Sequence, residues 1–399
     1  MKLFSSVELA PHDPILGLNE AFNADNRPNK VNLGVGVYFD SNGKLPLLRA
    51  VQEAEKQRIA ARLPRGYLPI EGIAAYNVAV QQILFGKDSN LLAEKRVVTV
   101  QTLGGTGALK IGADFLKQLN PNVNVAISDP SWENHRALFS SVGFNVISYP
   151  YYDPHTHGVN LSNMLDMLDK ESPGTIVVLH ACCHNPTGVD LSLEQWAQVL
   201  EVIKKRNLVP FIDIAYQGFG DGIDADAAVI RLFAKSELNF FISSSFSKSF
   251  SLYGERVGAL SIVTRSNDES TRVLSQLKCV IRTNYSNPPT HGAAVVSSVL
   301  GTPELRTMWE DELTQMRQRI HSMRLSIVER LLSQDGDRDF SFVIQQRGMF
   351  SYSGLSADQV ERLREKFGIY AVSTGRICVA TLNEKNIDYV ASSIAQVIR

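Results

Sequence analysis

Short apolar runs alternate with helical stretches along the middle of the chain, from about residue 97 to residue 264. Several runs are apolar at successive positions, which is typical of strands covered on both faces. Strands separated by helices predict a layered α/β domain with a mostly parallel sheet. Seven strands are expected, at residues 97–102, 123–129, 144–151, 175–182, 208–214, 239–245 and 258–264. One intervening helix is indicated by apolar residues at helical spacing, namely Leu193, Trp196, Ala197, Leu200 and Ile203.

The last two runs are separated only by the segment "SFSKSFSLYGERVG", so one edge of the sheet is expected to be antiparallel. A long helix is predicted from Pro303 to about Leu332, with Thr302 as the candidate N-cap. It ends near "SQDGDRD", and a second group of strands and helices follows to the C-terminus. This second group indicates a smaller domain.

Composition narrows the class of protein. The chain has 399 residues, which is enough for a large core, and a formal net charge of -1. Without a long basic run, nucleic acid and anionic membranes are not expected as main partners. The four cysteines form no C-x-x-C pair, so neither a disulfide framework nor a metal site is predicted. No signal peptide and no apolar run of about 18 residues are found, and a cytoplasmic location is expected.

Lys248 follows the apolar run "NFFIS" and stands among serines and phenylalanines. Burial disfavours the charged form of a lysine. One interpretation is that its stem is buried while the ammonium reaches water. The other is that the amine is held neutral and acts as a nucleophile. The residue alone does not separate the two.

Asp213 and Tyr216 lie at the end of another apolar run, in "FIDIAYQGFG". A carboxylate at the end of a buried strand is costly unless a cation or strong donors meet it. A structural ion pair or a helix cap is one explanation. A carboxylate that faces a protonated heterocycle is the other.

Two glycine-containing turns follow predicted strands. In "QTLGGTGALK" a strand leads through Gly104, Gly105, Thr106 and Gly107 into a helix, where backbone N–H groups can hold an anion. A plain tight turn uses the same residues. In "HACCHNPTG", Asn185 lies at the carboxyl end of a strand, where open α/β sheets bind their ligands, although a turn alone also explains the motif.

These motifs together resemble one family. The sequence is similar to the fold-type I, class I pyridoxal-phosphate aminotransferases, in the aspartate and aromatic amino acid branch. The resemblance covers essentially the whole chain, from "DPILGL" to "GRICVA". The family's stretches occur in order: "NLGVGVY", "YLPIEG", "GGTGAL", "DPSWENH", "HACCHNPTG", "DIAYQGF", "SFSKSFSLYGERVG" and "NYSNPP".

The resemblance implies a fold and an assembly. A large cofactor-binding domain (46–304) would hold a mixed, mostly parallel seven-stranded sheet between helices. A smaller α/β domain would come from both ends of the chain (13–45 and 305–399). Residues 1–12 would form an arm that packs on the partner subunit of a homodimer with composite active sites.

The resemblance also implies the cofactor, pyridoxal 5'-phosphate, bound covalently to Lys248 as an aldimine. Lys248, Asp213 and Tyr216 would be catalytic, with Lys248 moving the proton after substrate displaces it, and Asp213 holding the pyridine N–H. The remaining cofactor contacts would come from Tyr67, Gly105, Thr106, Trp132, Asn185, Ser245 and Arg256. His135 and His180 would support Asp213, and Tyr67 would reach the phosphate from the neighbouring subunit.

The substrate would be held by two arginines. Arg376 would bind the α-carboxylate in a two-pronged contact that lysine cannot reproduce. Arg282, from the partner subunit, would bind a second carboxylate. Gly36 would give a close backbone contact, and the remaining substrate contacts would be Tyr67, Trp132 and Asn185.

The implied reaction is ping-pong transfer of an amino group from aromatic amino acids to 2-oxoglutarate, with activity on aspartate as well. The apolar Phe39 and Leu45 favour aromatic donors, whereas Val37, Thr106 and Asn287 are more similar to aspartate-preferring enzymes. A strictly aspartate-preferring aminotransferase is therefore the alternative. A lyase or decarboxylase of the same fold is a remoter one, since it has little need for both Arg376 and Arg282. A non-catalytic binding protein is the third class, and a yellow colour of the purified protein would exclude it.

Overall fold

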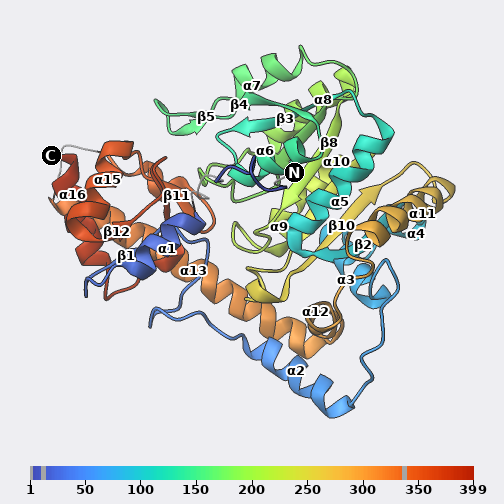
Figure 1. Cartoon of the computed structure of the whole chain (residues 1–399), viewed down its shortest axis with the longest axis horizontal. Coiled ribbons are helices and arrows are strands. Elements are labelled where there is room, and N and C mark those ends of the chain that lie inside the picture. Colours follow the sequence, from blue (N-terminus) through green and yellow to red (C-terminus); the bar gives the residue numbers. More distant parts are fainter. Residues whose placement is uncertain (1–2, 10–14, 335–338) are drawn as a thin grey trace.

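The computed structural model describes residues 3–9, 15–334 and 339–399. It has two lobes, and one long helix, α13 (Pro303–Gln334), runs from one to the other (Figure 1). The smaller lobe contains segments from both ends of the sequence. The domain boundaries implied above stay a prediction. Parts of the expected arm (1–2 and 10–12) and the first residues of "DPILGL" (13–14) lie outside the described residues.

A seven-stranded mixed sheet forms the centre of the larger lobe. Its spatial order is β2-β10-β9-β8-β7-β3-β4, and every pair is parallel except the two that β10 makes. The seven predicted strands are confirmed. Their bounds are β2 Val97–Leu103, β3 Asn124–Asp129, β4 Asn145–Pro150, β7 Ile176–His180, β8 Val209–Ile214, β9 Phe240–Ser245 and β10 Val257–Val263.

One edge of the sheet is antiparallel, as expected, because the edge strand β2 pairs antiparallel with β10, which itself lies one position in from the edge. β10 reverses direction after β9 because the short connection leaves no room for a crossover helix. Its other side is then paired with β2, from Val97 opposite Val263 to Leu103 opposite Val257. The edge strand β2 comes first in the sequence, and no local pattern tells which strand it will join.

Helices cover both faces of this sheet. Ile176 and Val178 of β7 pack in one core, and Val177 and Leu179 pack in the core on the opposite face. Alternate side chains of a strand point to opposite faces, so a continuous apolar run is what two cores require. One face carries α5 (Gly104–Leu119), α6 (Glu133–Ser141) and α11 (Asn267–Asn284). The other carries α3 (Ala74–Phe85), α7 (Leu161–Leu168), α8 (Leu193–Arg206), α10 (Ala228–Ala234) and α12 (His291–Gly301).

The helix expected between two strands is α8, but its buried face differs slightly from the apolar positions that indicated it. The buried residues are Trp196, Val199, Leu200 and Ile203. Leu193 and Ala197 are exposed, although they share the helical spacing of the buried residues. Leu193 lies in the first turn, next to the Ser192 cap, before the helix reaches its packed face. Ala197 points about 100° away from Trp196 around the helix.

The smaller lobe is built from short elements around the second half of α13. They are α1 (Leu16–Ala24), β1 (Val31–Asn32), α14 (Phe342–Gln345), β11 (Phe350–Tyr352), α15 (Ala357–Phe367), β12 (Ile369–Tyr370), β13 (Arg376–Cys378), the 3-10 turn η2 (Val379–Thr381) and α16 (Ile387–Ile398). β1 pairs with β12 in parallel, and β11 pairs with β13 antiparallel. The first of these pairs joins segments from the two ends of the chain. α13 begins at Pro303 as predicted, and residues 335–338 of the predicted helix end lie outside the described residues.

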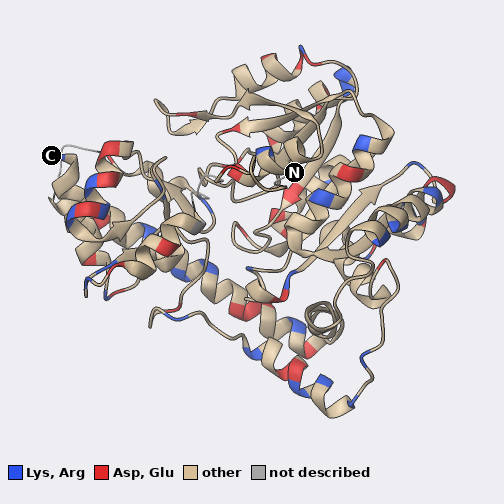
Figure 2. Ribbon diagram, viewed as in Figure 1, with Lys and Arg blue, Asp and Glu red and all other residues tan. Residues whose placement is uncertain are grey.

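The remaining elements are short or peripheral. They are α2 (Arg49–Ala61), which packs against α12 and α13, α4 (Asn90–Ala93), β5 (Tyr152–Asp153), β6 (Gly158–Val159), α9 (Ile223–Asp226) and the 3-10 turn η1 (Tyr253–Glu255). Charged residues of both signs are interspersed along the outer helices, whereas the central strands carry few (Figure 2). Within the described ranges, no helix combines the length and the apolar character needed to cross a membrane.

Candidate active site

A cavity of about 270 Å³ lies at the carboxyl ends of the parallel strands, where an α/β sheet of this kind binds its ligands. Of the predicted site residues, all but Tyr67 and Arg282 line it. They are Gly36, Gly105, Thr106, Trp132, Asn185, Asp213, Tyr216, Ser245, Lys248, Arg256 and Arg376. The motifs found separately along the sequence therefore meet in one place.

Asp213 lies near the end of β8 and is buried. Its Oδ2 accepts a hydrogen bond from His135 Nε2 at 3.0 Å, and Ser131 Oγ lies 3.0 Å from the other ring nitrogen of His135. Burial by itself would raise the pKa of Asp213. The hydrogen bond from His135 and the electrostatic effect of its ring instead hold that pKa below its usual value. The carboxylate is therefore charged at neutral pH and can face a protonated ring nitrogen.

His180 lies opposite Asp213 in the register of β7 and β8 and lines the cavity. Its ring centroid is 5.0 Å from that of His135, nearly perpendicular to it. Burial, together with the neighbouring His135, lowers the pKa of His180 to about 3, so the ring is neutral. Both histidines thus lie beside Asp213, and His135 makes the direct hydrogen bond.

Lys248 lies just after β9, and its Nζ is 4.8 Å from the ring centroid of Tyr216. Burial, aided by the charge of Arg256 and opposed by that of Asp213, lowers the pKa of Lys248 to about 8. About a tenth of the amine is then uncharged at pH 7, far more than for an ordinary lysine, and the uncharged amine is the nucleophilic form. Burial also raises the pKa of Tyr216, so its hydroxyl stays protonated and can donate a hydrogen bond.

The first turn of α5 forms one wall of the cavity. The first N–H groups of a helix have no partner within it and carry the positive end of its dipole. A Cβ added at Gly105 would lie 3.1 Å from the Cβ of Ser245, so the backbone approaches the strand closely here. Arg256 lies against the same turn, since a Cβ at Gly104 would be 2.5 Å from its Nη2. The N–H groups of this helix end, the hydroxyl of Ser245 and the guanidinium of Arg256 can together hold an anion such as a phosphate.

Arg376 begins β13 and is 1% exposed. Its Nη1 donates to Asn185 Oδ1 at 3.1 Å and its Nη2 to the Gly34 carbonyl at 2.7 Å. Its buried Nε has no hydrogen-bond partner within the described part of the chain. A buried donor left without a partner is costly, so this guanidinium is prepared for an anionic ligand in the cavity.

Tyr67 and Arg282 lie outside this cavity. Tyr67 is 95% exposed, and Arg282 is exposed near the end of α11, where it contacts the Ser286 hydroxyl. Phe39 and Leu45 do not line the cavity either, and Gly36 is its only described lining residue from the segment 36–45. The backbone N–H of Phe39 donates a hydrogen bond to the Ala380 carbonyl, and the side chain of Leu45 is about half exposed.

Sequence reasoning missed two aromatic residues of the cavity. Tyr253 lies between Lys248 and Arg256, and its hydroxyl accepts the backbone N–H of Tyr38 at 3.0 Å. An aromatic residue inside the lysine motif was an available signal. Phe350 lines the cavity from β11, and no local pattern distinguishes it from a core phenylalanine.

One buried group outside this chemistry has potential metal ligands. Cys182, Cys183 and Asp226 bring their ligand atoms within 4.8 Å of one another. The Asp226 carboxylate already accepts backbone N–H bonds from Gly218, Gly220 and Asp221, which makes it a brace for that loop. We assign no metal to this group.

Comparisons with known proteins agree with this arrangement. A family model for aminotransferase class I and II matches residues 28–394. An aspartate aminotransferase of Pseudomonas aeruginosa is 69% identical and covers 100% of both chains. An aromatic-amino-acid aminotransferase of Escherichia coli is 50% identical, over 99% of this chain and 100% of the relative. The structure of an aromatic-amino-acid aminotransferase from Burkholderia pseudomallei, covalently bound to pyridoxal phosphate, is 70% identical with a TM-score of 0.98 over 100% of both chains. With a match of this length and these relatives, the chain belongs to the class I and II aminotransferase family.

Proposed function

We propose that this aminotransferase uses pyridoxal 5'-phosphate to move amino groups from aromatic amino acids and aspartate to 2-oxoglutarate. The observation that carries the proposal is the convergence of Lys248, Asp213 and Arg376 on one cavity. An amine of lowered pKa, a buried carboxylate and a guanidinium with an unpartnered N–H are the three groups that this chemistry requires.

The residues present fit this cofactor. Gly105, Thr106, Ser245 and Arg256 would hold its phosphate, and Trp132 would stack on its ring. Asn185 and Tyr216 would donate to its phenolic oxygen, and Asp213 and Lys248 line the same cavity. Lys248 is the proposed point of covalent attachment. When bound, the cofactor supplies an electron sink for the carbanion formed at the α-carbon of the substrate.

The chain's own side chains then divide the work. Arg376 binds the α-carboxylate with two parallel N–H bonds and so orients the amino acid. Asp213 keeps the ring nitrogen protonated, and His135 holds that carboxylate in place. Lys248 takes the proton from the α-carbon of the substrate and later gives it back to complete the amino transfer. It can do both because its pKa lies near the working pH.

Substrate preference is the open choice among relatives. The Pseudomonas aeruginosa relative is named for aspartate, and the Burkholderia pseudomallei structure, at nearly the same identity, is named for aromatic amino acids. The names of these two relatives cover both substrate classes. We favour dual specificity with aromatic preference, because the apolar Phe39 and Leu45 belong to the segment that follows Gly36, although they do not line the cavity themselves. A strictly aspartate-preferring enzyme is retained as the alternative. A lyase or decarboxylase of the same fold is the remoter candidate, because the family match and the relatives are aminotransferases.

The donor preference is tested by kcat/KM for phenylalanine, tyrosine and aspartate with 2-oxoglutarate as acceptor. Burying about 100 Å² of aromatic ring is worth ~2–3 kcal/mol, so aromatic donors should lead by tens of fold. Phe39→Ser should reduce this lead, and Phe342→Ser, at another half-buried phenylalanine outside the cavity lining, serves as a control. An advantage of about tenfold or more for aspartate over both aromatics would show that the preference is wrong.

We further propose a homodimer in which Tyr67 and Arg282 complete the partner's site. Both side chains are exposed, and exposed apolar residues lie near Tyr67 in the sequence: Ile59, Leu63 and Val78. Leu3, Phe4, Val7 and Leu9 of the expected arm are also exposed. A twofold interface would cover such surfaces and place each residue in both sites.

Buried thiols such as Cys183 and Cys378 fit the proposed cytoplasmic location.

Hybrid dimers test this assembly. Lys248→Ala chains and Arg282→Ala chains, each inactive on aspartate, are unfolded together, refolded and assayed. With composite sites, a mixed dimer contains one site with both residues intact, so about a quarter of wild-type aspartate activity should return. If each site used only its own chain, mixing would restore nothing. Full activity of a sedimenting monomer would also contradict the proposal.

A further inference from the structure

Arg324 of α13 is 2% exposed and lies outside the cavity. Its guanidinium makes four hydrogen bonds, all to residues 343–351. Nη1 donates to the Val343 carbonyl at 3.3 Å and to the Ser351 hydroxyl, and Nη2 donates to the carbonyls of Gly348 at 2.7 Å and Phe350 at 2.6 Å. No ion pair joins it to an acidic residue in the described ranges.

A buried charge without a counter-charge is expensive, and the hydrogen bonds only offset that cost. Burial lowers the pKa of Arg324 to about 10, so the side chain is still charged at neutral pH. An apolar residue would fill such a core position more cheaply. The arginine is therefore better explained by what it holds, which is the backbone that leads into and through β11.

This backbone segment packs on the loop that carries Asn185. Arg347 N donates to the Gly188 carbonyl at 2.6 Å. Gly188 has a φ of +70°, and a Cβ there would lie 2.7 Å from the carbonyl oxygen of Phe350. At Gly348 a Cβ would lie 2.4 Å from that of Cys183. Segment and loop thus fit together without space for adjustment.

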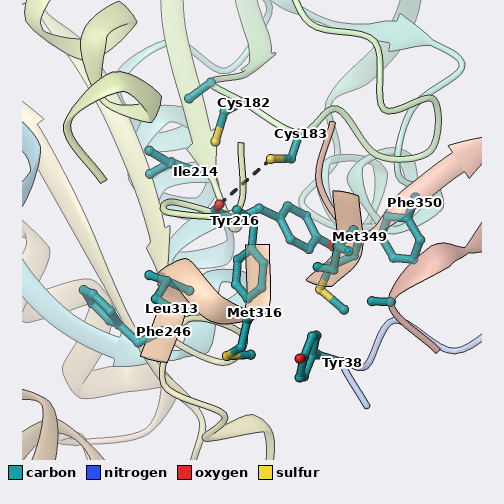
Figure 3. Close-up of a cluster of buried hydrophobic side chains, with 14 of the residues drawn as sticks. Tyr38, Cys182, Cys183, Ile214, Tyr216, Phe246, Leu313, Met316, Met349 and Phe350 are labelled. Carbon is teal, nitrogen blue, oxygen red and sulfur yellow. Dashed lines mark hydrogen bonds between the residues drawn. The ribbon is translucent and has the colours of Figure 1, made fainter. Parts of the chain in front are cut away.

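Phe350 belongs to this fixed segment, and its side chain lines the cavity. The guanidinium carbon of Arg376 lies 4.3 Å from its ring centroid, and the ring of Tyr216 meets it edge-on at 5.9 Å. A Cβ at Gly36 would lie 3.1 Å from the same ring. Figure 3 shows Tyr216 beside Met349 and Phe350, which arrive together from this segment. The ring of Phe350 therefore forms the surface against which the Arg376 guanidinium packs.

We propose that Arg324 is a positioning residue for Arg376, acting through the backbone of β11 and the ring of Phe350. The inference rests on the proposed function, in which Arg376 binds the α-carboxylate. Removing the four hydrogen bonds would leave β11 held by its pairing with β13, and this weaker support would let Phe350 shift and loosen the guanidinium. A displacement of about 1 Å in a group that orients substrate is enough to cost about a hundredfold in rate.

The test compares two amines in the full-length holoenzyme. Phenylalanine carries an α-carboxylate and phenethylamine does not. The rate of amino transfer from each to the bound cofactor is followed by cofactor absorbance in a single turnover. In Arg324→Gln the ratio of the phenylalanine rate to the phenethylamine rate should fall by about tenfold or more, with the phenethylamine rate within about twofold of wild type. Arg324→Lys should restore part of the ratio.

Arg330→Gln is the matched control, since Arg330 lies on the same helix and pairs with Asp388 of α16 instead of β11. Its ratio should equal that of wild type. If Arg324→Gln does not fold, Arg324→Lys and Phe350→Leu decide, and both should lower the ratio. An unchanged ratio, or equal losses for both amines, would overturn the inference.

Arg376→Lys separates this inference from the proposed function. If Arg376→Lys lowers the ratio and the Arg324 variants do not, only the positioning role fails. If Arg376→Lys leaves the ratio unchanged, the assignment of the α-carboxylate to Arg376 fails, and the positioning role fails with it.

Discussion

Replacing Lys248 with alanine is expected to abolish multiple-turnover transamination while the cofactor still binds without a covalent bond. The amine is the proposed attachment point and the only group in the described cavity lining whose pKa is brought to about 8 by burial. Positioned acid–base catalysis alone contributes about 10²–10⁴-fold, and loss of the attachment point adds to this. Turnover should therefore fall by more than about 10⁴-fold, measured with phenylalanine and aspartate.

Borohydride reduction gives a readout independent of turnover. The wild-type chain should gain the mass of the cofactor, and the Lys248→Ala chain should not, although its absorbance shows the cofactor bound. Lys110→Ala is the control, because Lys110 pairs with Asp114 on the outer part of α5. Near-native turnover of Lys248→Ala would contradict the whole assignment.

Replacing Asp213 with alanine should cost several kcal/mol of transition-state stabilisation and weaken cofactor binding. One preorganised electrostatic group supplies about 2.7–4 kcal/mol, or about 10²–10³ in kcat. Because the pKa of Asp213 lies below its usual value, the carboxylate is charged across the working range. Asp213 itself therefore adds no titration between about pH 6 and about pH 9, and a change of the loss across this range reports the titration of Lys248, whose pKa the Asp213 charge raises.

Asp213→Asn separates charge from shape. It keeps the side-chain volume and the contact with His135, so a structural cap would tolerate it, whereas a partner for a protonated ring would not. The equilibrium dissociation constant of the cofactor and the melting temperature are measured alongside kcat. Activity of Asp213→Ala within about threefold of wild type would mark Asp213 as structural.

The seven strands were predictable because two cores impose a pattern on each of them. Residues 176–179 are apolar at every position, and the structure divides them between opposite faces of the sheet. The position of β10 was not predictable in the same way. Strand order depends on pairing between β10 and β2, which are distant in the sequence, and no local pattern records it.

For the site, residues that follow strands were found together with their chemistry. Asp213 lies near the end of a recognisable apolar run, Asn185 and Lys248 follow such runs, and the carboxyl ends of parallel strands meet at one edge of the sheet. Gly36 and Arg376 come from the two ends of the chain. Only the resemblance to a family placed them at this edge, because their local sequences do not point to a strand end.

What the sequence by itself determined is the set of groups and the layered fold, because apolar periodicity and motif chemistry are local properties. The tertiary structure decided how these groups are held. It buried the charged Arg324 against carbonyl groups of β11, and it left Phe39 and Leu45 outside the cavity that their chemistry suggested they would line. An arginine is ordinarily exposed, and a phenylalanine or leucine is often buried. Which of these holds depends on contacts between distant segments, and those exist only once the two lobes are folded together.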